Sequence, residues 1–233
     1  MDKPVCVVVG VGEGNGAALA RRFSDDGYAT ALLARGLDYT TALAAELPDS
    51  KAYACDVGEA RAVGEAFAAI RHDLGEPAVL AYNAGSGVWG SAEEISPAQF
   101  EAAWRVNALG LLLCAQQVTP AMKAKGAGAI VVTGATASRR GGIKTAAFAP
   151  AKAAQRSLCE SLARRLWPAG IHVAVIIVDG VVDLPRTRAA MPDKPASFFV
   201  QPDDVAANAA WLVAQPRSAW SFEIEARPFG ETW

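Results

Sequence analysis

The stretch that decides the fold is Val5-Cys6-Val7-Val8-Val9, followed without a break by Gly10-Val11-Gly12-Glu13-Gly14-Asn15-Gly16. An unbroken apolar run is typical of a strand buried on both faces of a parallel sheet. Glycines where a strand meets a helix let the backbone turn sharply and approach a diphosphate, which then rests on the N–H groups of the helix. The stretch therefore predicts a first βαβ unit that binds a dinucleotide. A plain glycine-rich loop is the alternative.

Strand-like and helix-like segments alternate along the rest of the chain. Apolar runs recur at residues 29–34, 52–55, 79–82, 130–133, 173–178 and 222–226. Helix-like segments occupy residues 16–24, 59–74, 97–125, 148–167 and 203–214. Short connections between them predict an α/β fold with one doubly wound parallel sheet and helices on both faces. We expect residues 1–233 to form a single domain.

Composition excludes several classes of protein. Hydrophobic residues make up 52% of the 233 positions and charged residues 20%, which is unlike a disordered chain. The formal net charge is 22 − 24 = −2, and neither half is strongly basic, so we expect no nucleic-acid partner.

The ends and the cysteines carry further expectations. No basic n-region or cleavage site precedes the first apolar run, and no charge-free run reaches the roughly 18 residues of a membrane span. The four cysteines (6, 55, 114 and 159) lack Cys-x-x-Cys spacing, so we expect buried free thiols rather than disulfides or a metal site. Together these features predict a cytoplasmic protein with no membrane partner.

The end of the second predicted strand bears on the choice of cofactor. NAD-binding sites carry an acid about 20 residues past the glycines, but here Arg35 follows the strand and the next acid is Asp38. A guanidinium can form paired hydrogen bonds to a 2′-phosphate. The sequence therefore favours NADP(H), with NAD(H) less favoured. An exposed loop arginine is the alternative, and Glu13 in the glycine loop would repel the phosphate.

Further motifs complete a family resemblance. Gly10, Gly14 and Gly16 fit the spacing Gly-x-x-x-Gly-x-Gly, and Asn107 lies in a long middle helix. With these the chain resembles the short-chain dehydrogenase/reductase family over essentially its whole length, which implies a Rossmann-type fold. In that family an acid holds the adenine, and Asp56-Val57 matches it; Asn83-Ala84-Gly85 matches three residues of the Asn-Asn-Ala-Gly motif. The plainer alternatives are that Asp56 caps a helix or begins a loop, that Asn83-Ala84-Gly85 forms a turn, and that Asn107 is an ordinary helix asparagine.

The same resemblance implies the catalytic positions, and here the chain departs from the pattern. The family uses a Tyr-x-x-x-Lys pair and a serine about a dozen residues earlier. Lys152 matches the lysine, but Phe148 stands in the place of the tyrosine and Ala135 in that of the serine. Losing a general acid typically lowers the rate by about 10²- to 10⁴-fold. Other proton sources to consider are Thr136, Ser138 and Asp179, with a turn role the simpler reading of Asp179.

The resemblance leaves the substrate open. We expect a small carbonyl or alcohol substrate at this site, or else a non-catalytic NADP(H)-binding sensor or partner subunit. Residues 183–199 correspond to a mobile lid, in which Arg186 and Arg188 could meet an anion, and Trp89 could line the mouth. Residues 97–125 and 148–167 resemble the family's dimer helices, so we expect a homodimer or homotetramer.

Overall fold

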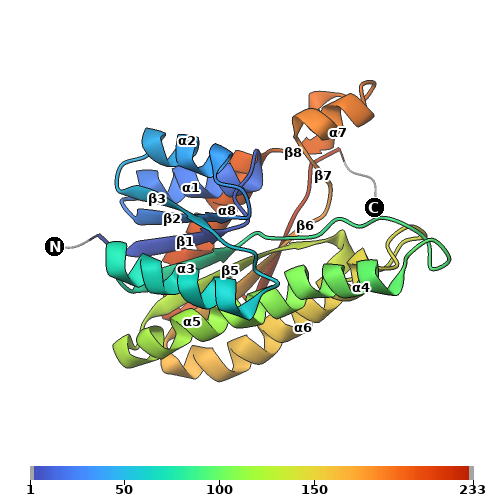
Figure 1. The fold of residues 1–233 in the computed structure, drawn as a ribbon. Coiled ribbons are helices and arrows are strands. Elements are labelled where there is room, and N and C mark those ends of the chain that lie inside the picture. Colours follow the sequence, from blue (N-terminus) through green and yellow to red (C-terminus); the bar gives the residue numbers. More distant parts are fainter. Residues whose placement is uncertain (1–2, 231–233) are drawn as a thin grey trace.

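The computed structural model describes residues 3–230, and its centre is a seven-stranded sheet in which every neighbouring pair is parallel (Figure 1). The spatial order of the strands is β3-β2-β1-β4-β5-β6-β9, so the direction in which the chain adds strands reverses between β1 and β4. This confirms the predicted doubly wound α/β fold. The strands are β1 (Val5–Val9), β2 (Ala29–Ala34), β3 (Ser50–Ala54), β4 (Pro77–Tyr82), β5 (Gly128–Ala135), β6 (Ile171–Val178) and β9 (Glu223–Ala226).

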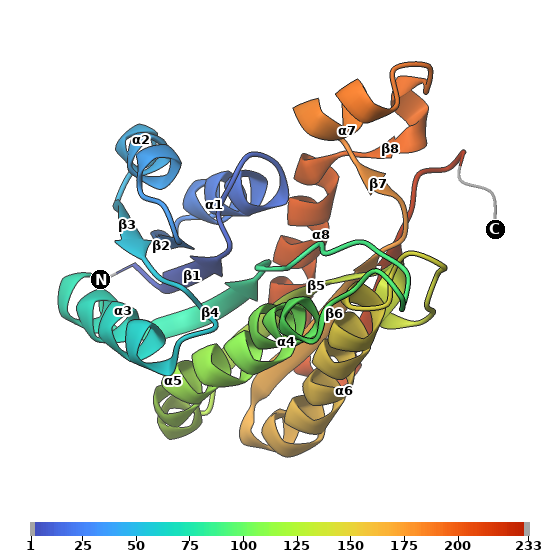
Figure 2. The ribbon, with the colours of Figure 1, turned by 45° about the vertical axis from the view of Figure 1, so that its right-hand side comes forward.

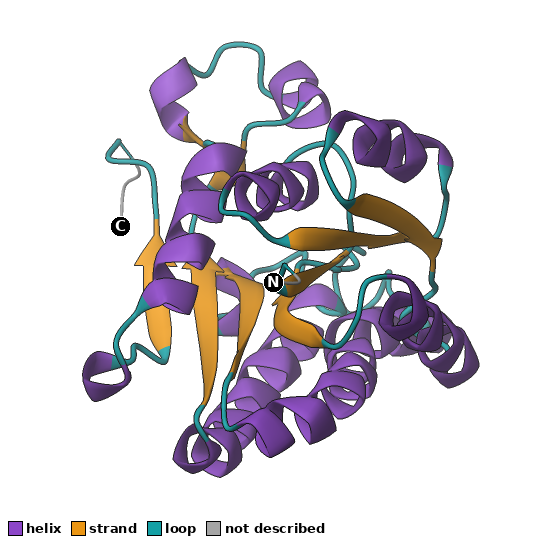
Figure 3. Ribbon diagram, turned by 90° about the vertical axis from the view of Figure 1, so that its left-hand side faces the viewer, coloured by secondary structure: helices purple, strands orange, loops and turns teal. Residues whose placement is uncertain are grey.

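Helices cover both faces of the sheet (Figure 3). One face is covered by α1 (Asn15–Asp25), α2 (Asp38–Glu46) and α8 (Pro202–Ala214). The other is covered by α3 (Ala60–Asp73), α5 (Gly110–Lys125) and α6 (Phe148–Leu166). Because both faces are covered, β1 and β6 are buried along their whole length, which explains their continuous apolar sequences.

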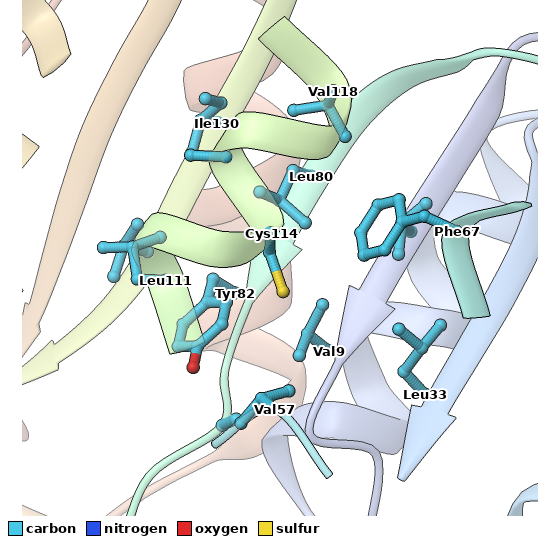
Figure 4. Packing of buried hydrophobic residues seen from close by; sticks show 14 of the residues in the cluster. Val9, Leu33, Val57, Phe67, Leu80, Tyr82, Leu111, Cys114, Val118 and Ile130 are labelled. Atoms are coloured by element: carbon cyan, nitrogen blue, oxygen red, sulfur yellow. The ribbon is translucent and has the colours of Figure 1, made fainter. Parts of the chain in front are cut away.

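The core beneath α3 and α5 combines large side chains with free thiols. Phe67, Tyr82 and Leu111 are fully buried there, and the Cys114 thiol lies among them (Figure 4). All four cysteines are buried and unpaired, as predicted. Burial raises the pKa of the Cys6 thiol and raises that of Cys55 to about 11, so these thiols stay protonated and act as small apolar groups.

The predicted single helix over residues 97–125 is wrong in one respect, because a π-turn at Arg105–Leu109 separates α4 (Pro97–Trp104) from α5. In a π-turn the backbone hydrogen bonds join residues five apart, so each hydrogen-bonded ring is wider than in an α-helix. The buried Tyr82 hydroxyl donates to the Val106 carbonyl at 2.5 Å, and a Cβ on Gly110 would lie 2.5 Å from that hydroxyl. The tyrosine therefore occupies the widened turn, which also carries Asn107.

Between β6 and α8 the chain leaves the sheet as a separate excursion (Figure 2). It contains β7 (Val181–Val182), α7 (Pro185–Ala190) and β8 (Phe199–Val200), with β7 and β8 paired in parallel. Neither α2 nor α7 was predicted, since their short segments lack a strong apolar stripe.

Among residues 3–230, every helix is too short or too polar to cross a bilayer.

Candidate active site

Three glycines shape the loop between β1 and α1, each in a different way. Gly10 has φ 84°, and a Cβ there would lie 2.5 Å from the Ala84 backbone; one on Gly16 would lie 2.5 Å from the Gly10 carbonyl oxygen. A Cβ on Gly12 would meet nothing within 4 Å. Gly10 and Gly16 are thus required for close packing, whereas Gly12 borders open space.

The start of α1 fits a diphosphate. Its N-cap is Gly14, with φ 108°, and no side chain caps the first turn. N–H groups at an uncapped helix N-terminus favour anions. Among residues 3–230, the buried Oδ1 of Asn15 has no hydrogen-bond partner, so it is available to accept a hydrogen bond from a ligand.

The end of β4 is tied to the glycine loop. Asn83 donates through its side chain to the Gly10 carbonyl at 2.9 Å, and its backbone N–H donates to the Val9 carbonyl at 2.9 Å. Ala84 is buried against Gly10, and Gly85 follows at the surface. The predicted residues Asn83, Ala84 and Gly85 therefore lie at the switch point of the sheet, where ligands bind in open α/β folds.

Arg35 and Glu13 are both exposed beside this loop. The backbone N–H groups of Gly10 and Val11 donate to the Leu33 carbonyl at 2.9 and 3.0 Å, which holds the glycine loop to the end of β2. Arg35 follows β2 directly. The two opposite charges thus flank the same end of the sheet.

Asp56 and Val57 follow β3, on the other side of β2. The Asp56 side chain accepts a hydrogen bond from the Gly58 N–H at 2.9 Å and is otherwise exposed, while Val57 is buried against Gly110. The carboxylate therefore shapes its own turn and still presents an oxygen to solvent.

Lys152 and Asn107 meet inside the fold. Lys152 is 5% exposed, and its Nζ donates to the Thr133 carbonyl at 2.8 Å and to the Gln155 Oε1 at 2.9 Å. Asn107 is fully buried and donates to the Ala103 carbonyl at 2.8 Å. Burial lowers the pKa of Lys152 to about 8, because desolvation disfavours the charged amine.

Phe148 and Ala135 are partly exposed and lie near this buried pair along α6 and β5, and we call them its entrance. Phe148 is in the first turn of α6, one turn before Lys152, and its ring packs on that of Trp89 with centroids 5.5 Å apart. Trp89 is 64% exposed, so it does line an open surface beside Phe148. Ala135 ends β5, and its N–H donates to the Ser138 hydroxyl oxygen at 3.1 Å.

Of the other candidate proton sources, Thr136 and Asp179 bond each other, whereas the Ser138 hydroxyl only accepts from the Ala135 N–H. The Thr136 hydroxyl donates to Asp179, which is buried, and Asp179 also accepts from Arg227 at 2.5 Å and from Arg140 at 3.5 Å. This ionic cluster joins the carboxyl ends of β5, β6 and β9. It gives Asp179 a clear structural role, more than that of a simple turn residue.

The excursion after β6 reaches back to the glycine loop. The Leu184 side chain lies directly against the Cα of Gly14. Arg188 is not free to meet an anionic substrate, because both carboxylate oxygens of Asp183 accept from it at 2.6 and 2.7 Å. That pairing lowers the pKa of Asp183 to about 2. Arg186 is exposed.

Most predicted site residues thus gather at the carboxyl ends of the strands, between the glycine loop and Lys152. Two contributors were missed from the sequence. Leu184 carries no recognisable signal, whereas Gln155, three residues after Lys152, falls on the same helix face and was open to detection.

Comparisons with known proteins agree with this arrangement. The chain is 28% identical over 226 residues to a D-threitol dehydrogenase of Mycolicibacterium smegmatis, covering 92% of this chain and 87% of that protein. A short-chain dehydrogenase from Rhodopseudomonas palustris is 30% identical, with a TM-score of 0.84 over 97% of this chain and 99% of that one. An alcohol dehydrogenase from Thermococcus sibiricus, solved with 5-hydroxy-NADP, is 26% identical, with a TM-score of 0.88 over 98% of both chains.

Residues 4–194 match the short chain dehydrogenase family. The match spans the glycine loop, the switch point and Lys152. The chain is therefore a member of the short-chain dehydrogenase family of oxidoreductases.

Proposed function

We propose that this chain is an NADP(H)-dependent oxidoreductase that acts on a small carbonyl or alcohol through an atypical active site. The observation that carries the proposal is the buried Lys152 beside Asn107, at the same sheet edge as an intact glycine loop. A buried lysine is costly to keep unless it serves the site. A nicotinamide cofactor, when bound, supplies the hydride.

Several residues of the chain would hold that cofactor. The open face of Gly12 and the uncapped start of α1 suit the diphosphate, and Arg35 suits a 2′-phosphate. The 5-hydroxy-NADP complex of the related alcohol dehydrogenase supports NADP, while Glu13 opposes it by charge. Asp56 is proposed to hold the adenine, and Lys152 the nicotinamide ribose.

The atypical feature is that neither Phe148 nor Ala135, the entrance residues at the family's catalytic positions, carries a hydroxyl group. Phe148 stands where the family has its tyrosine, and Ala135 where it has its serine. Positioning of the reacting carbons remains, but the usual proton donor does not. This same observation supports a second candidate function, a catalytically defective NADP(H)-binding sensor or partner subunit.

Two measurements on the purified protein test these functions. Fluorescence titration should show NADPH binding about ten- to a hundredfold tighter than NADH, the worth of one charged bidentate contact. Arg35→Ala should remove this preference, and Arg61→Ala, which alters an exposed arginine on α3, should not. Equal binding of both cofactors by the wild type would contradict the selectivity.

Turnover of NADPH with a panel of aldehydes and ketones separates the two functions. Slow but measurable reduction supports the oxidoreductase. Tight NADPH binding without turnover on any carbonyl supports the sensor or partner subunit. Failure to bind either cofactor contradicts both.

A further inference from the structure

A closed hydrogen-bonded chain surrounds Lys152. Its Nζ donates to the Thr133 carbonyl of β5 at 2.8 Å and to Gln155 Oε1 at 2.9 Å. The Gln155 Nε2 in turn donates to the Asn107 carbonyl at 2.9 Å. Gln155 is 1% exposed and Lys152 is 5% exposed, so both side chains are largely buried.

The orientation of the Gln155 amide follows from its partners. An ammonium group has only donors, and a carbonyl has only acceptor sites. The Oε1 must therefore face Lys152, and the Nε2 must face Asn107. Gln155 thereby links α6 to the π-turn and fixes the position of Nζ from one side, while Thr133 fixes it from the other.

Because Gly85 has no side chain, a gap beside it borders both Lys152 Nζ and Asn107 Oδ1, and an ammonium group that donates two hydrogen bonds has one N–H left. A Cβ built on Gly85 would lie 3.7 Å from Lys152 Nζ and 3.4 Å from Asn107 Oδ1. Among residues 3–230, that Asn107 oxygen is buried and has no hydrogen-bond partner. A water between them would accept from Nζ and donate one hydrogen to Oδ1, which satisfies both groups and leaves its second hydrogen available.

We propose that Lys152 is itself the proton donor for carbonyl reduction, acting through a water in the gap beside Gly85, and that Gln155 is the residue that positions it. This rests on the proposed oxidoreductase function. Because neither Phe148 nor Ala135 carries a hydroxyl group, a donor at Lys152 would replace the proton source that the family has at these positions.

With NADPH bound, the carbonyl carbon would accept a hydride from the cofactor while the carbonyl π pair moves to oxygen. That oxygen would take a proton from the bridging water, and the water would take one from Lys152 Nζ. The carbonyl would thereby become an alcohol and NADPH would become NADP⁺. The neutral amine would then regain a proton from solvent at the exposed Gly85.

The groups that face Lys152 suit this task. They are the Thr133 carbonyl from β5, Asn107 from the π-turn, and Gln155 and the Cys159 thiol from α6. Burial raises the pKa of Cys159 to about 12, so this thiol is neutral near pH 8. Burial lowers the pKa of Lys152 to about 8, a value suited to a general acid at neutral pH.

Lysine side-chain NMR tests the positioning without any turnover. In cofactor-free protein labelled with ¹⁵N-lysine, one of the seven lysines should titrate near pH 8, and this signal should be missing in Lys152→Met. Gln155→Glu places a carboxylate against Nζ and should raise the midpoint by about one pH unit or more. Gln116→Glu, which adds the same charge at an exposed site on α5, should leave it unchanged.

The pH profile of NADPH-dependent reduction tests the donor role. The rate should be constant below about pH 8 and fall above it. Gln155→Glu should shift this fall to higher pH by the same amount as it shifts the NMR midpoint. Lys152→Met should lower kcat by about 10²-fold or more.

Three outcomes would overturn the inference. One is a titration midpoint of Lys152 that Gln155→Glu leaves unchanged. Another is turnover that survives Lys152→Met, which would leave the oxidoreductase function intact but move the proton source elsewhere. The third is tight NADPH binding with no carbonyl reduction at any pH, which would also favour the sensor function.

Discussion

At the scale of single residues, the site contrasts an intact interior with an altered entrance. Lys152, Asn107 and Gln155 form a fully buried polar network whose members fix one another. In front of it, Phe148 and Trp89 present two packed rings without a hydroxyl group. The residues that hold the amine are therefore in place, whereas the two positions at which the family has its tyrosine and serine hydroxyls carry none.

Restoring both hydroxyls should raise activity. We expect Phe148→Tyr with Ala135→Ser to increase NADPH-dependent ketone reduction by about 10²-fold or more, because a general acid and a second donor return together. Phe148→Tyr alone should give less. The measurement is kcat on a carbonyl that the wild type reduces slowly.

Two results would count against this expectation. Efficient wild-type turnover on an ordinary ketone would mean that the entrance needs no hydroxyl. A double variant that binds NADPH tightly yet gains nothing would mean that the substrate pocket has a different shape. Adding Lys152→Ala should abolish the gain, because the new tyrosine would lose the charge that lowers its pKa.

Lys152 also makes stability depend on pH. Its folded pKa of about 8 lies below its unfolded value of 10.5, so between these pH values the unfolded chain binds more protons. Stability from this residue is therefore lowest below pH 8 and rises toward pH 10.5, by at most about 3 kcal/mol. The buried thiols act in the opposite direction, so the comparison must be between variants.

Thermal unfolding of Lys152→Met and wild type should isolate the effect. The stability of the variant relative to wild type should decline steadily as the pH rises from 8 to 10.5. Lys144→Met, at an exposed lysine, should show no such trend. A constant difference for Lys152→Met would mean that the amine is not desolvated.

At the scale of elements, the glycine loop shows what a sequence can and cannot predict. The motif Gly10-x-x-x-Gly14-x-Gly16 predicted the strand, the turn and the helix, because only glycine permits these close approaches. The π-turn was not predicted, since it arises from Tyr82, a residue on a strand that precedes it by more than twenty positions. The same holds for the ionic cluster at Asp179 and for Leu184, which depend on chain segments far apart in sequence.

The glycines of that loop should respond differently to a methyl group. Gly12→Ala meets no atom within 4 Å, so the fold should keep its melting temperature, while NADPH binding should weaken at least tenfold if the diphosphate lies there. Gly16→Ala would press on the Gly10 carbonyl and the Val11 backbone, both closer than 3 Å, and should lower the melting temperature as well. Calorimetry and fluorescence titration check the pair. Unchanged binding in Gly12→Ala would place the diphosphate elsewhere.

At the scale of the whole molecule, the sheet brings the predicted residues to one edge. Seven parallel strands point their carboxyl ends the same way, so loops that are distant in sequence meet there. On the face of the sheet opposite α1, α2 and α8, the helices α4, α5 and α6 form one broad outer layer (Figure 2). The sequence predicts that this layer forms the interface between copies of the chain.

We expect this outer layer to join identical chains. Phe100 and Trp104 on α4 are 44% and 43% exposed, and the small Ala153 on α6 is exposed nearby. Part of the apolar excess has another explanation, since Leu158 and Leu162 pack against the chain's own core. The exposure of the Phe100 and Trp104 rings has no such explanation within a single chain. Light scattering at micromolar concentration should give two or four times 24.2 kDa.

A matched pair of variants decides whether these helices form that contact. In a two-fold interface each substitution occurs twice, so Ala153→Arg should place two like charges in it and shift the mass toward the monomer. Thr41→Arg, at an exposed position of α2 on the other face of the sheet, should leave the mass unchanged. A wild-type mass near 24 kDa would contradict the oligomer outright. A dimer that tolerates Ala153→Arg would show that another surface joins the chains, because two buried arginine charges cost far more than such a contact can absorb.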